Sequence, residues 1–171
     1  MRDVYGDQKE KEEGFLNCED TPSRYAETLL VCRTGEAKEF PLMCTAKNGD
    51  VGYDLYTVRD TTVPAKGCRP VDVPTGVSVK VPNGFWGYII GRSSTARKHG
   101  LDIVPGVIDT GYTGELFACC WNRNDEDFVI PKGTRVAQLV IKKVYTPEVF
   151  EVDELPRTER GATGFGSTDK K

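Results

Sequence analysis

The alternation of apolar and polar residues predicts β-strands along most of the chain. In segment 71–81, Val77, Val79 and Val81 fall on one face and polar residues separate them, which is the two-residue period of a half-buried strand. Further short apolar runs occupy 29–34, 84–90, 101–109, 114–122, 134–145 and 148–155. The 18 Gly and 10 Pro residues mark turns between such runs, a spacing typical of a sandwich or barrel. We therefore predict an all-β fold without a long amphipathic helix.

One short helix is predicted at 95–99, within the sequence GRSSTARKHG. Ser93 or Ser94 would cap its N-terminus, because serine side chains accept hydrogen bonds from the unpaired N–H groups of the first turn. Gly100 would end the helix, because glycine readily adopts the left-handed conformation that commonly follows one.

The two ends of the chain differ in composition from the segment between them. Residues 1–26 are polar and acidic without periodicity, which predicts a flexible acidic extension. Residues 27–158 contain the apolar runs and form the predicted β domain. Residues 159–171 are rich in glycine and are not suited to a strand that packs in a core, so we expect a mobile arm that becomes ordered on binding.

Composition and charge restrict the classes of partner. Apolar residues make up 38% of the 171 residues, enough for the core of one domain. A formal net charge of −3 disfavours a nucleic-acid partner, so any phosphate site must be built locally. Neither a membrane-spanning stretch nor the apolar core of a signal peptide is evident. We expect an intracellular protein, cytoplasmic or nuclear, that is not secreted and has no membrane partner.

Six cysteines raise the question of zinc binding or disulfide formation. None belongs to a C-x-x-C pair, and His99 is the single histidine, which disfavours a zinc site. Reduced thiols that pack in the interior are favoured instead. The single histidine also disfavours a Ser-His-Asp hydrolase, and we expect His99 to lie on the surface.

The first segment with candidate chemistry is GRSS (91–94). Arg92, Ser93 and Ser94 precede the predicted helix, where unpaired N–H groups favour an anion. A guanidinium and two hydroxyl groups there would hold phosphate oxygens. On the local pattern alone, a helix cap beside a surface arginine is equally well supported.

The second candidate is PGVIDTGYTGEL (105–116), which joins two apolar runs by a connection longer than a two-residue turn. We expect a hairpin that holds Asp109 and Tyr112 at one edge, where the Asp109 carboxylate could polarise a water molecule. Viewed alone, an aspartate that merely starts a turn is the favoured explanation.

Two weaker candidates lie on predicted strands. In GYDL (52–55), Asp54 could bind magnesium, which often takes one or two carboxylates besides substrate phosphates. In GTRVAQL (133–139), Gln138 needs a hydrogen-bond partner if it faces inward, and a structural partner is the usual explanation.

The glycine-rich end RGATGFGST (160–168) fits neither the P-loop nor the G-x-G-x-x-G motif, so both are rejected. Arg160, Ser167 and Thr168 could still hold phosphate, and Phe165 could stack on a base. A plain linker is the alternative.

Taken in order, the segments VGYDL, GRSS, GVIDTGYTGEL, GTRVAQL and RGATGFGST closely resemble the five motifs of the trimeric dUTPase family. The resemblance covers about residues 27–168. It implies a jelly-roll-like β-barrel or sandwich that forms a homotrimer with three active sites at subunit interfaces. It also implies Mg²⁺-assisted hydrolysis of dUTP to dUMP and pyrophosphate, which limits dUTP incorporation into DNA and supplies dUMP for dTMP synthesis.

The resemblance also implies roles for individual residues, contributed by different subunits to one site. Asp109 orients the attacking water, Tyr112 packs under the deoxyribose, and Asp54 holds magnesium through water. Phosphates are contacted by Arg92, Ser93, Ser94 and Gln138. Uracil is bound around Gly106, Val107, Ile108 and Phe117. The arm that closes over the nucleotide contains Arg160, Phe165, Gly166, Ser167 and Thr168.

Two positions depart from the family pattern. Ser94 stands where many relatives have glycine, so its hydroxyl either adds a contact or crowds the phosphate. Asp169 follows Thr168 where many relatives have glycine, and its carboxylate would weaken closure of the arm unless it faces solvent.

Two alternatives are a dCTP deaminase and a binding or regulatory protein built on a dUTPase scaffold. The deaminases resemble this chain in the Arg-Ser-Ser segment, but they place a glutamate three residues before an asparagine, whereas here Cys119 stands three residues before Asn122. Asp109, Tyr112 and Arg160 are all present, which disfavours a scaffold without turnover.

Overall fold

The computed structural model describes residues 26–45, 47–66 and 69–162. Expectations for the N-terminal extension up to residue 25 and for residues 163–171 lie outside this range. The elements are β1 (Leu30–Arg33), the 3-10 helix η2 (Glu36–Glu39), β2 (Gly52–Tyr56), β3 (Thr61–Val63), β4 (Val71–Lys80), β5 (Phe85–Gly91), α1 (Ser93–His99), β6 (Leu101–Ile103), β7 (Gly106–Ile108), β8 (Glu115–Asn122), β9 (Phe128–Ile130) and β10 (Arg135–Lys143). Neither helix in this part of the chain could span a membrane.

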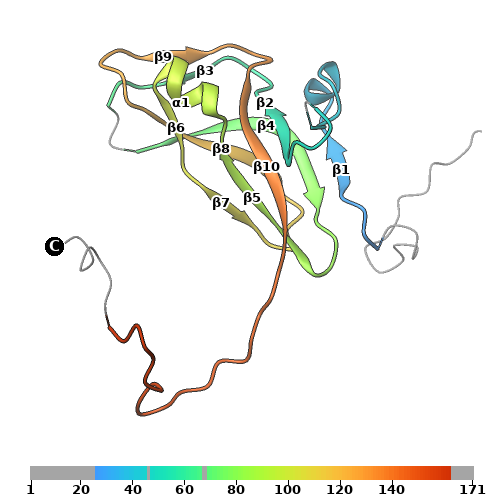
Figure 1. The fold of residues 1–171 in the computed structure, drawn as a ribbon. Helices are drawn as coiled ribbons and strands as arrows, with labels where there is room; N and C mark the ends of the chain where they lie inside the picture. Colours follow the sequence, from blue (N-terminus) through green and yellow to red (C-terminus); the bar gives the residue numbers. More distant parts are fainter. Residues whose placement is uncertain (1–25, 46, 67–68, 163–171) are drawn as a thin grey trace, which may run out of the picture.

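Two four-stranded antiparallel sheets and one additional strand pair make up the described fold (Figure 1). Sheet A has the order β1-β4-β8-β6, sheet B has the order β2-β10-β5-β7, and β3 pairs with β9. Strands that follow one another in the chain belong to different sheets throughout, so the chain crosses repeatedly between layers, as in a sandwich. The predicted antiparallel, mostly β fold is confirmed.

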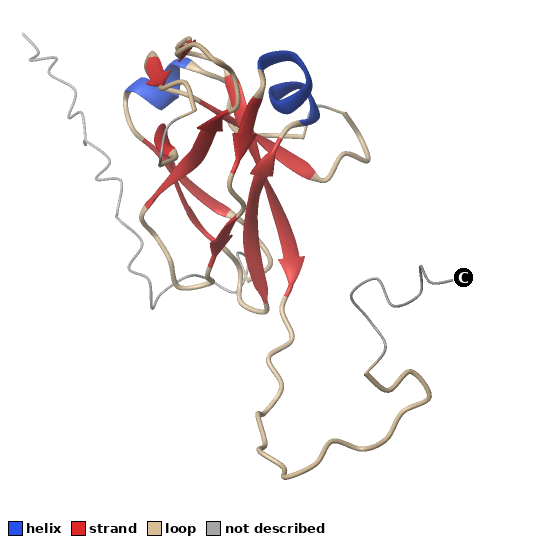
Figure 2. Cartoon of the chain, turned by 90° about the vertical axis from the view of Figure 1, so that its left-hand side faces the viewer, coloured by secondary structure: helices blue, strands red, loops and turns tan. Residues whose placement is uncertain are grey.

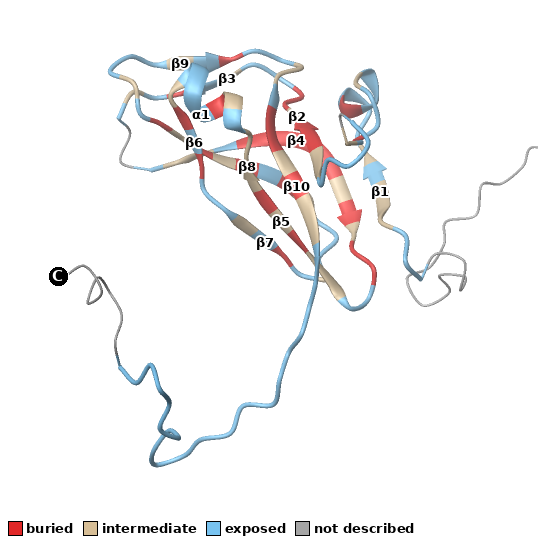
Figure 3. Cartoon of the chain, viewed as in Figure 1, coloured by how far each residue is buried: buried red, intermediate tan, exposed pale blue. Residues whose placement is uncertain are grey.

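Sheets A and B share one hydrophobic core (Figure 3). Leu55 and Leu139 from sheet B and Leu116 from sheet A are at most 1% exposed. The alternation predicted for β4 is confirmed, because Val77 and Val79 are buried. Because Val and Leu side chains of this kind each contribute about 1.5–3 kcal/mol when fully buried, this core holds both sheets rigid beneath the residues discussed below.

The single strand predicted at 101–109 is wrong, since the segment forms two strands in different sheets. β6 pairs with β8 in sheet A, whereas β7 pairs with β5 in sheet B. Val104 and Pro105 connect them, and proline lacks the N–H group that an uninterrupted ladder needs. The strands β3 and β9 were not predicted, because each has only three residues.

The strand predicted at 148–155 is also wrong. This segment is a loop that leaves the sheets, as Figure 2 shows, and Val149 and Phe150 are 95% and 89% exposed. Alternating apolar residues favour a strand, but the backbone groups of a strand need a neighbour with which to pair. Within the described part of this chain, no segment pairs with 148–155.

Helix α1 begins two residues earlier than predicted. Arg92, with an extended backbone, occupies the N-cap position without a side-chain cap, so neither Ser93 nor Ser94 is the capping residue. The earlier start is stabilised by Thr95, whose buried hydroxyl donates a hydrogen bond of 3.1 Å to the Val136 carbonyl on β10. The predicted end is confirmed, because Gly100 adopts φ 63° in the left-handed region.

Candidate functional site

Three charged side chains from β2, β10 and the β5–α1 junction form a compact cluster. The Asp54 carboxylate is 7% exposed and lies 2.8 Å from Nε of Arg92 through Oδ1. Its Oδ2 atom lies 3.2 Å from Nη1 of Arg135. With two guanidinium groups and one carboxylate, the cluster carries a net positive charge, which favours an anion.

A polar cavity of about 300 Å³ opens beside this cluster. Its lining residues are Asp50, Val51, Gly52, Asp54, Arg92, Ser93, Ser94 and Gln138. Gln138 stands opposite Asp54 in the β10–β2 ladder, and its side-chain amide donates a hydrogen bond of 3.2 Å to the Gly91 carbonyl. The structure therefore brings together the GYDL, GRSS and GTRVAQL residues that the sequence singled out.

Gly52 makes this close approach possible. A Cβ atom at Gly52 would lie 2.8 Å from Cδ and 3.3 Å from Cβ of Gln138. Both separations are shorter than ordinary van der Waals contact, so a larger residue would displace the Gln138 amide from the cavity wall.

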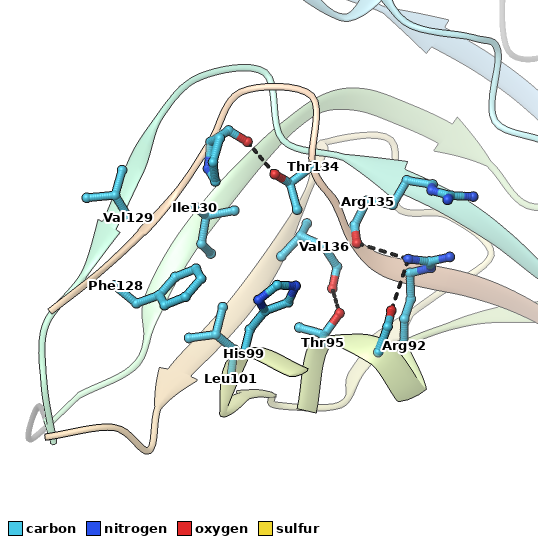
Figure 4. Close-up of a pocket in the computed structure, with 12 residues that line it drawn as sticks. Arg92, Thr95, His99, Leu101, Phe128, Val129, Ile130, Thr134, Arg135 and Val136 are labelled. Atoms are coloured by element: carbon cyan, nitrogen blue, oxygen red, sulfur yellow. Dashed lines mark hydrogen bonds between the residues drawn. The ribbon is translucent and has the colours of Figure 1, made fainter. Parts of the chain in front are cut away.

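An apolar cavity of about 320 Å³ shares Arg92 and Ser94 with the polar cavity and is also lined by Arg135 (Figure 4). Leu101, Phe128, Ile130 and Val136 line it, and Arg92 belongs to the walls of both cavities. The exposed His99 confirms the prediction of a surface histidine, although its ring also lies against Phe128 with 5.5 Å between centroids.

The segment predicted as a hairpin is instead a divergence of two strands. β6 and β8 pair as far as Ile103 and Cys120, and the Val104 N–H donates to the Cys119 carbonyl at 2.8 Å. Beyond that bond β7 continues in sheet B and β8 in sheet A. Within the described residues, no ladder joins β7 to β8, so the edges of the two strands that face one another keep backbone groups available for a ligand.

The residues predicted to surround uracil lie on β7 and β8. Gly106, Val107 and Ile108 form β7, and Phe117 lies on β8. The Val107 and Phe117 side chains are 63% and 42% exposed, whereas Ile108 packs into the core. Main-chain groups are therefore the polar atoms that these four residues offer.

The connection from β7 to β8 contains Asp109 and Tyr112 and is held by side-chain and backbone hydrogen bonds. Thr110 donates through its hydroxyl to the Phe85 carbonyl at 2.6 Å. The Tyr112 hydroxyl donates to the Glu115 carbonyl at 2.8 Å, and the Tyr112 N–H donates to the Asp109 carbonyl at 3.0 Å. The Asp109 carboxylate is held on this rigid connection and is exposed to solvent.

Gly114 lets the Tyr112 ring lie flat over the connection. A Cβ atom there would lie 2.7 Å from Cζ of the ring, so no other residue fits without displacing the tyrosine. The Tyr112 side chain is thereby a fixed, 42% exposed surface on which a ligand could rest.

Asp109 and Arg92 lie at opposite ends of β5 in the same chain. Ile108 pairs with Gly87 near the start of β5, whereas Arg92 directly follows its last residue. At about 3.4 Å per strand residue, the separation from Asp109 to Arg92 is roughly 20 Å. The two halves of the predicted site are therefore well separated within a single chain.

The described residues do not form a direct magnesium site. Among them no group of three His, Cys, Asp or Glu side chains is placed to hold a metal ion. Both oxygens of Asp54 are bound to guanidinium groups, which would repel a cation in direct contact. A carboxylate has about four lone-pair sites, so a hydrogen bond from a metal-bound water still fits.

The four cysteines within the described ranges are free thiols, as predicted, but they do not all pack in the interior. Cys120 is buried, and burial raises the pKa of its thiol to about 12. Burial and the neighbouring Asp72 carboxylate also raise the pKa of Cys119. Cys32 and Cys44 are exposed because they lie on the edge strand β1 and in the loop before β2.

Sequence reasoning missed Arg135 and Thr110 as parts of the site. Arg135 belongs to the segment GTRVAQL, yet nothing in the sequence indicated its contact with Asp54, 81 positions away. Of the predicted arm, Arg160 and Gly161 are described and exposed, and Phe165, Gly166, Ser167 and Thr168 lie outside the described residues.

Fold and site together define a mostly β protein with a polar cavity lined by Arg92 at one end of sheet B. At the other end lie the facing edges of β7 and β8, which no ladder joins within the described residues. A family model described as dUTPase matches residues 38–169. The deoxyuridine 5'-triphosphate nucleotidohydrolase of Paramecium bursaria Chlorella virus 1 is 45% identical over 141 residues, covering 82% of this chain and 97% of the relative. The corresponding protein of Arabidopsis thaliana is 46% identical over 117 residues, covering 68% and 69%.

Solved structures agree with this assignment. A Staphylococcus bacteriophage 80alpha dUTPase with dUPNHPP has a TM-score of 0.74 and 29% sequence identity, covering 82% of this chain and 97% of that chain. The protein belongs to the dUTPase family.

Proposed function

We propose that the protein hydrolyses dUTP to dUMP and pyrophosphate in active sites that several copies of the chain share. Membership of the dUTPase family makes it a dUTP hydrolase, and dUTP diphosphatase is the activity. The observation that carries the shared site is the separation of roughly 20 Å between Asp109 and Arg92 within one chain. Complete sites then require that Asp109 of one copy meet Arg92 of another, and the family resemblance favours a homotrimer.

One copy binds the triphosphate in the polar cavity. Arg92 supplies charge-assisted hydrogen bonds of the kind that guanidinium groups make to phosphate oxygens. Ser93 and Ser94 add hydroxyl groups, and Gln138 adds an amide on the wall of the same cavity. The Ser94 hydroxyl lies 3.4 Å from Nη1 of Arg92, which supports an added contact instead of crowding at this departure from the family pattern.

A second copy binds the nucleoside between β7 and β8. Main-chain groups of Gly106, Val107, Ile108 and Phe117 pair with the polar edge of uracil, and these strands exclude the methyl group of thymine by steric contact. The fixed Tyr112 ring packs beneath the deoxyribose and leaves no room for a ribose 2′-hydroxyl.

The same copy supplies Asp109 as general base. Its carboxylate takes a proton from a water molecule whose oxygen forms a bond to the α-phosphorus. The bond from the α-phosphorus to its bridging oxygen breaks, and pyrophosphate leaves with that oxygen. Asp109 is exposed on a connection fastened by Thr110 and Tyr112, which supports a base held ready for a nucleotide brought by a neighbouring copy.

Mg²⁺ bound to the triphosphate offsets its negative charge and improves pyrophosphate as a leaving group. Asp54 would contact that ion through water, since its own oxygens are bound to Arg92 and Arg135.

A third copy closes the site with the arm at 159–171. Arg160, Ser167 and Thr168 hold the γ-phosphate, and Phe165 and Gly166 cover the base. The arm begins beyond a described segment that leaves its own sheets with exposed apolar side chains at Val149, Phe150 and Leu155, which supports contact with another copy. The boundaries 27–158 for the domain and 159–171 for the arm follow from this division of roles.

A hydrolysis assay with a panel of nucleotides tests the proposed function. With magnesium present, pyrophosphate should be released from dUTP far faster than from dCTP, dTTP or UTP. Equal rates for UTP and dUTP would refute the role of Tyr112, release of ammonia from dCTP would favour a deaminase, and binding of dUTP without turnover would favour a regulatory scaffold. The dUMP produced would supply dTMP synthesis, and removal of dUTP would limit uracil in DNA.

A further inference from the structure

A β-bulge in β10 brings Arg135 onto the same face as Asp54. Gln138 pairs with Asp54 and Ala137 with Leu55, but Arg135 pairs with Tyr56, because the register shifts between Arg135 and Ala137. Strand residues normally alternate between the two faces, so the extra residue reverses the direction in which Arg135 points. Bulges of this kind often redirect a side chain beside an active site.

The contacts of Arg92 fix which edge of its guanidinium group faces the cavity. Its Nε atom is bound to Asp54 at 2.8 Å, and its Nη1 atom donates to Ser94 at 3.4 Å and to the Arg135 carbonyl at 3.3 Å. Arginine has five N–H donors in a planar fork. Within the described residues Nη2 makes no hydrogen bond, which leaves its donors for a phosphate oxygen.

We propose that Asp54 is a positioning residue that holds Arg92 and Arg135 together as a two-arginine clamp, and that Arg135 is a second guanidinium that binds the triphosphate. This inference rests on the proposed function and adds a residue to it. The Arg135 side chain is 46% exposed while its Nη1 is bound to Asp54. It lines the apolar cavity, which shares Arg92 and Ser94 with the polar cavity. Without the carboxylate between them, the positively charged guanidinium groups of Arg92 and Arg135 would repel each other and move apart.

The direction in which Asp54→Asn changes the affinity for a triphosphate distinguishes a positioning role from the alternatives. If Asp54 acted only through its charge, removing a negative group beside a triphosphate would tighten binding. If Asp54 were only a magnesium contact, its removal would change nothing in the absence of metal. A positioning role requires weaker binding even though the cavity becomes more positive.

Isothermal titration in EDTA tests the clamp with two probes, the imido analogue of dUTP and inorganic tripolyphosphate. Asp54→Asn and Arg135→Gln should each weaken binding of both probes about tenfold, equivalent to ~1.4 kcal/mol. The double variant should lose less than the sum of the two, because the residues act as a unit. Asp102→Asn is the matched control, since Asp102 pairs with Arg123 at 2.7 Å on the surface. The affinity of this variant for both probes should equal that of the unmodified protein.

Tighter or unchanged binding by Asp54→Asn in EDTA, or an effect confined to samples with magnesium, would overturn the clamp. If Asp54→Asn fails to fold by circular dichroism, Arg135→Gln decides alone, and unchanged binding of both probes by that variant would overturn the clamp. If the unmodified protein binds tripolyphosphate and responds to these substitutions but does not hydrolyse dUTP, the proposed function fails and the clamp stands. If neither probe binds the unmodified protein in EDTA, the clamp fails, whereas the proposed function is decided by the hydrolysis assay with magnesium.

Discussion

The separation of Asp109 from Arg92 along β5 makes a mixing experiment possible. Two inactive variants, Asp109→Asn and Arg92→Gln, each retain the half of the site that the other has lost. If one copy supplies the Asp109 connection and another the Arg92 cavity, assemblies that contain both chains should regain hydrolysis.

The expected recovery follows from random assembly of the two chains. In a closed, head-to-tail ring each site takes its Asp109 from one copy and its Arg92 from the next. In an equimolar mixture half of the chains carry each functional residue, so about one quarter of the sites contain both, and the mixture should regain about 25% of the unmodified activity. Each parent alone should show almost none, because every site lacks either the base or the guanidinium group.

Pyrophosphate release from dUTP is measured after the two variants are unfolded together and refolded, so that their chains exchange. Asp109→Asn mixed with Tyr112→Ala is the matched control. These two residues lie on one connection, between β7 and β8, so every site in that mixture has one damaged connection and the activity should not exceed the average of the two parents.

A mixture of Asp109→Asn with Arg92→Gln that forms mixed assemblies, shown by native mass spectrometry, yet stays as inactive as its parents would refute the reasoning. Recovery in the Asp109–Tyr112 control would refute it equally, since it would mean that the two residues serve different sites.

Four further predictions test individual parts of the site and fold. Asp109→Asn should still bind the imido analogue of dUTP by calorimetry while losing most pyrophosphate release, and near-normal turnover would exclude it as the base. Gly114→Ala should displace the Tyr112 ring and raise the rate on UTP relative to dUTP, whereas an unchanged ratio would exclude that ring from sugar selection. Deletion of 159–171 should leave a folded assembly by light scattering with little activity, and a full rate would exclude the arm. Burial raises the pKa of Cys120 to about 12 in the folded protein, so the contribution of its neutral thiol to the free energy of unfolding should be complete below about pH 9. As pH rises from there toward 12, the free energy of unfolding measured in urea should fall by at most ~1.4 kcal/mol per pH unit. A free energy that is independent of pH in this range would contradict the buried, neutral thiol.

Periodicity predicted the strands whose side chains alternate between core and solvent, and it failed where pairing is decided by distant segments. The Val77 and Val79 face of β4 and the left-handed Gly100 follow from local rules. By contrast, segment 148–155 alternates like a strand but has no neighbour in the described chain. A strand needs both an alternating pattern of side chains and a neighbouring strand with which to pair, and the sequence of the segment itself gives only the pattern.

The candidate site shows the same division. The type and order of residues predicted the phosphate and base segments only through the family resemblance, because each short pattern alone was explained as well or better by a structural role. The clamp was not predictable, since it depends on the bulge that turns Arg135 toward Asp54. Adjacent buried residues at Val136 and Ala137 are the trace of that bulge, but two apolar residues in succession are equally compatible with a strand buried on both faces.

Ser94 shows how a departure from the family pattern can be accommodated by its surroundings. Glycine at this position would let a phosphate approach the helix N-terminus closely, and a serine side chain takes up part of that space. Here the Ser94 hydroxyl accepts a hydrogen bond from Nη1 of Arg92, so it lies on the anchored edge of the guanidinium group. Nη2, which makes no hydrogen bond within the described residues, is left for the proposed phosphate contact, and the serine adds a hydrogen bond that helps to hold the arginine in place.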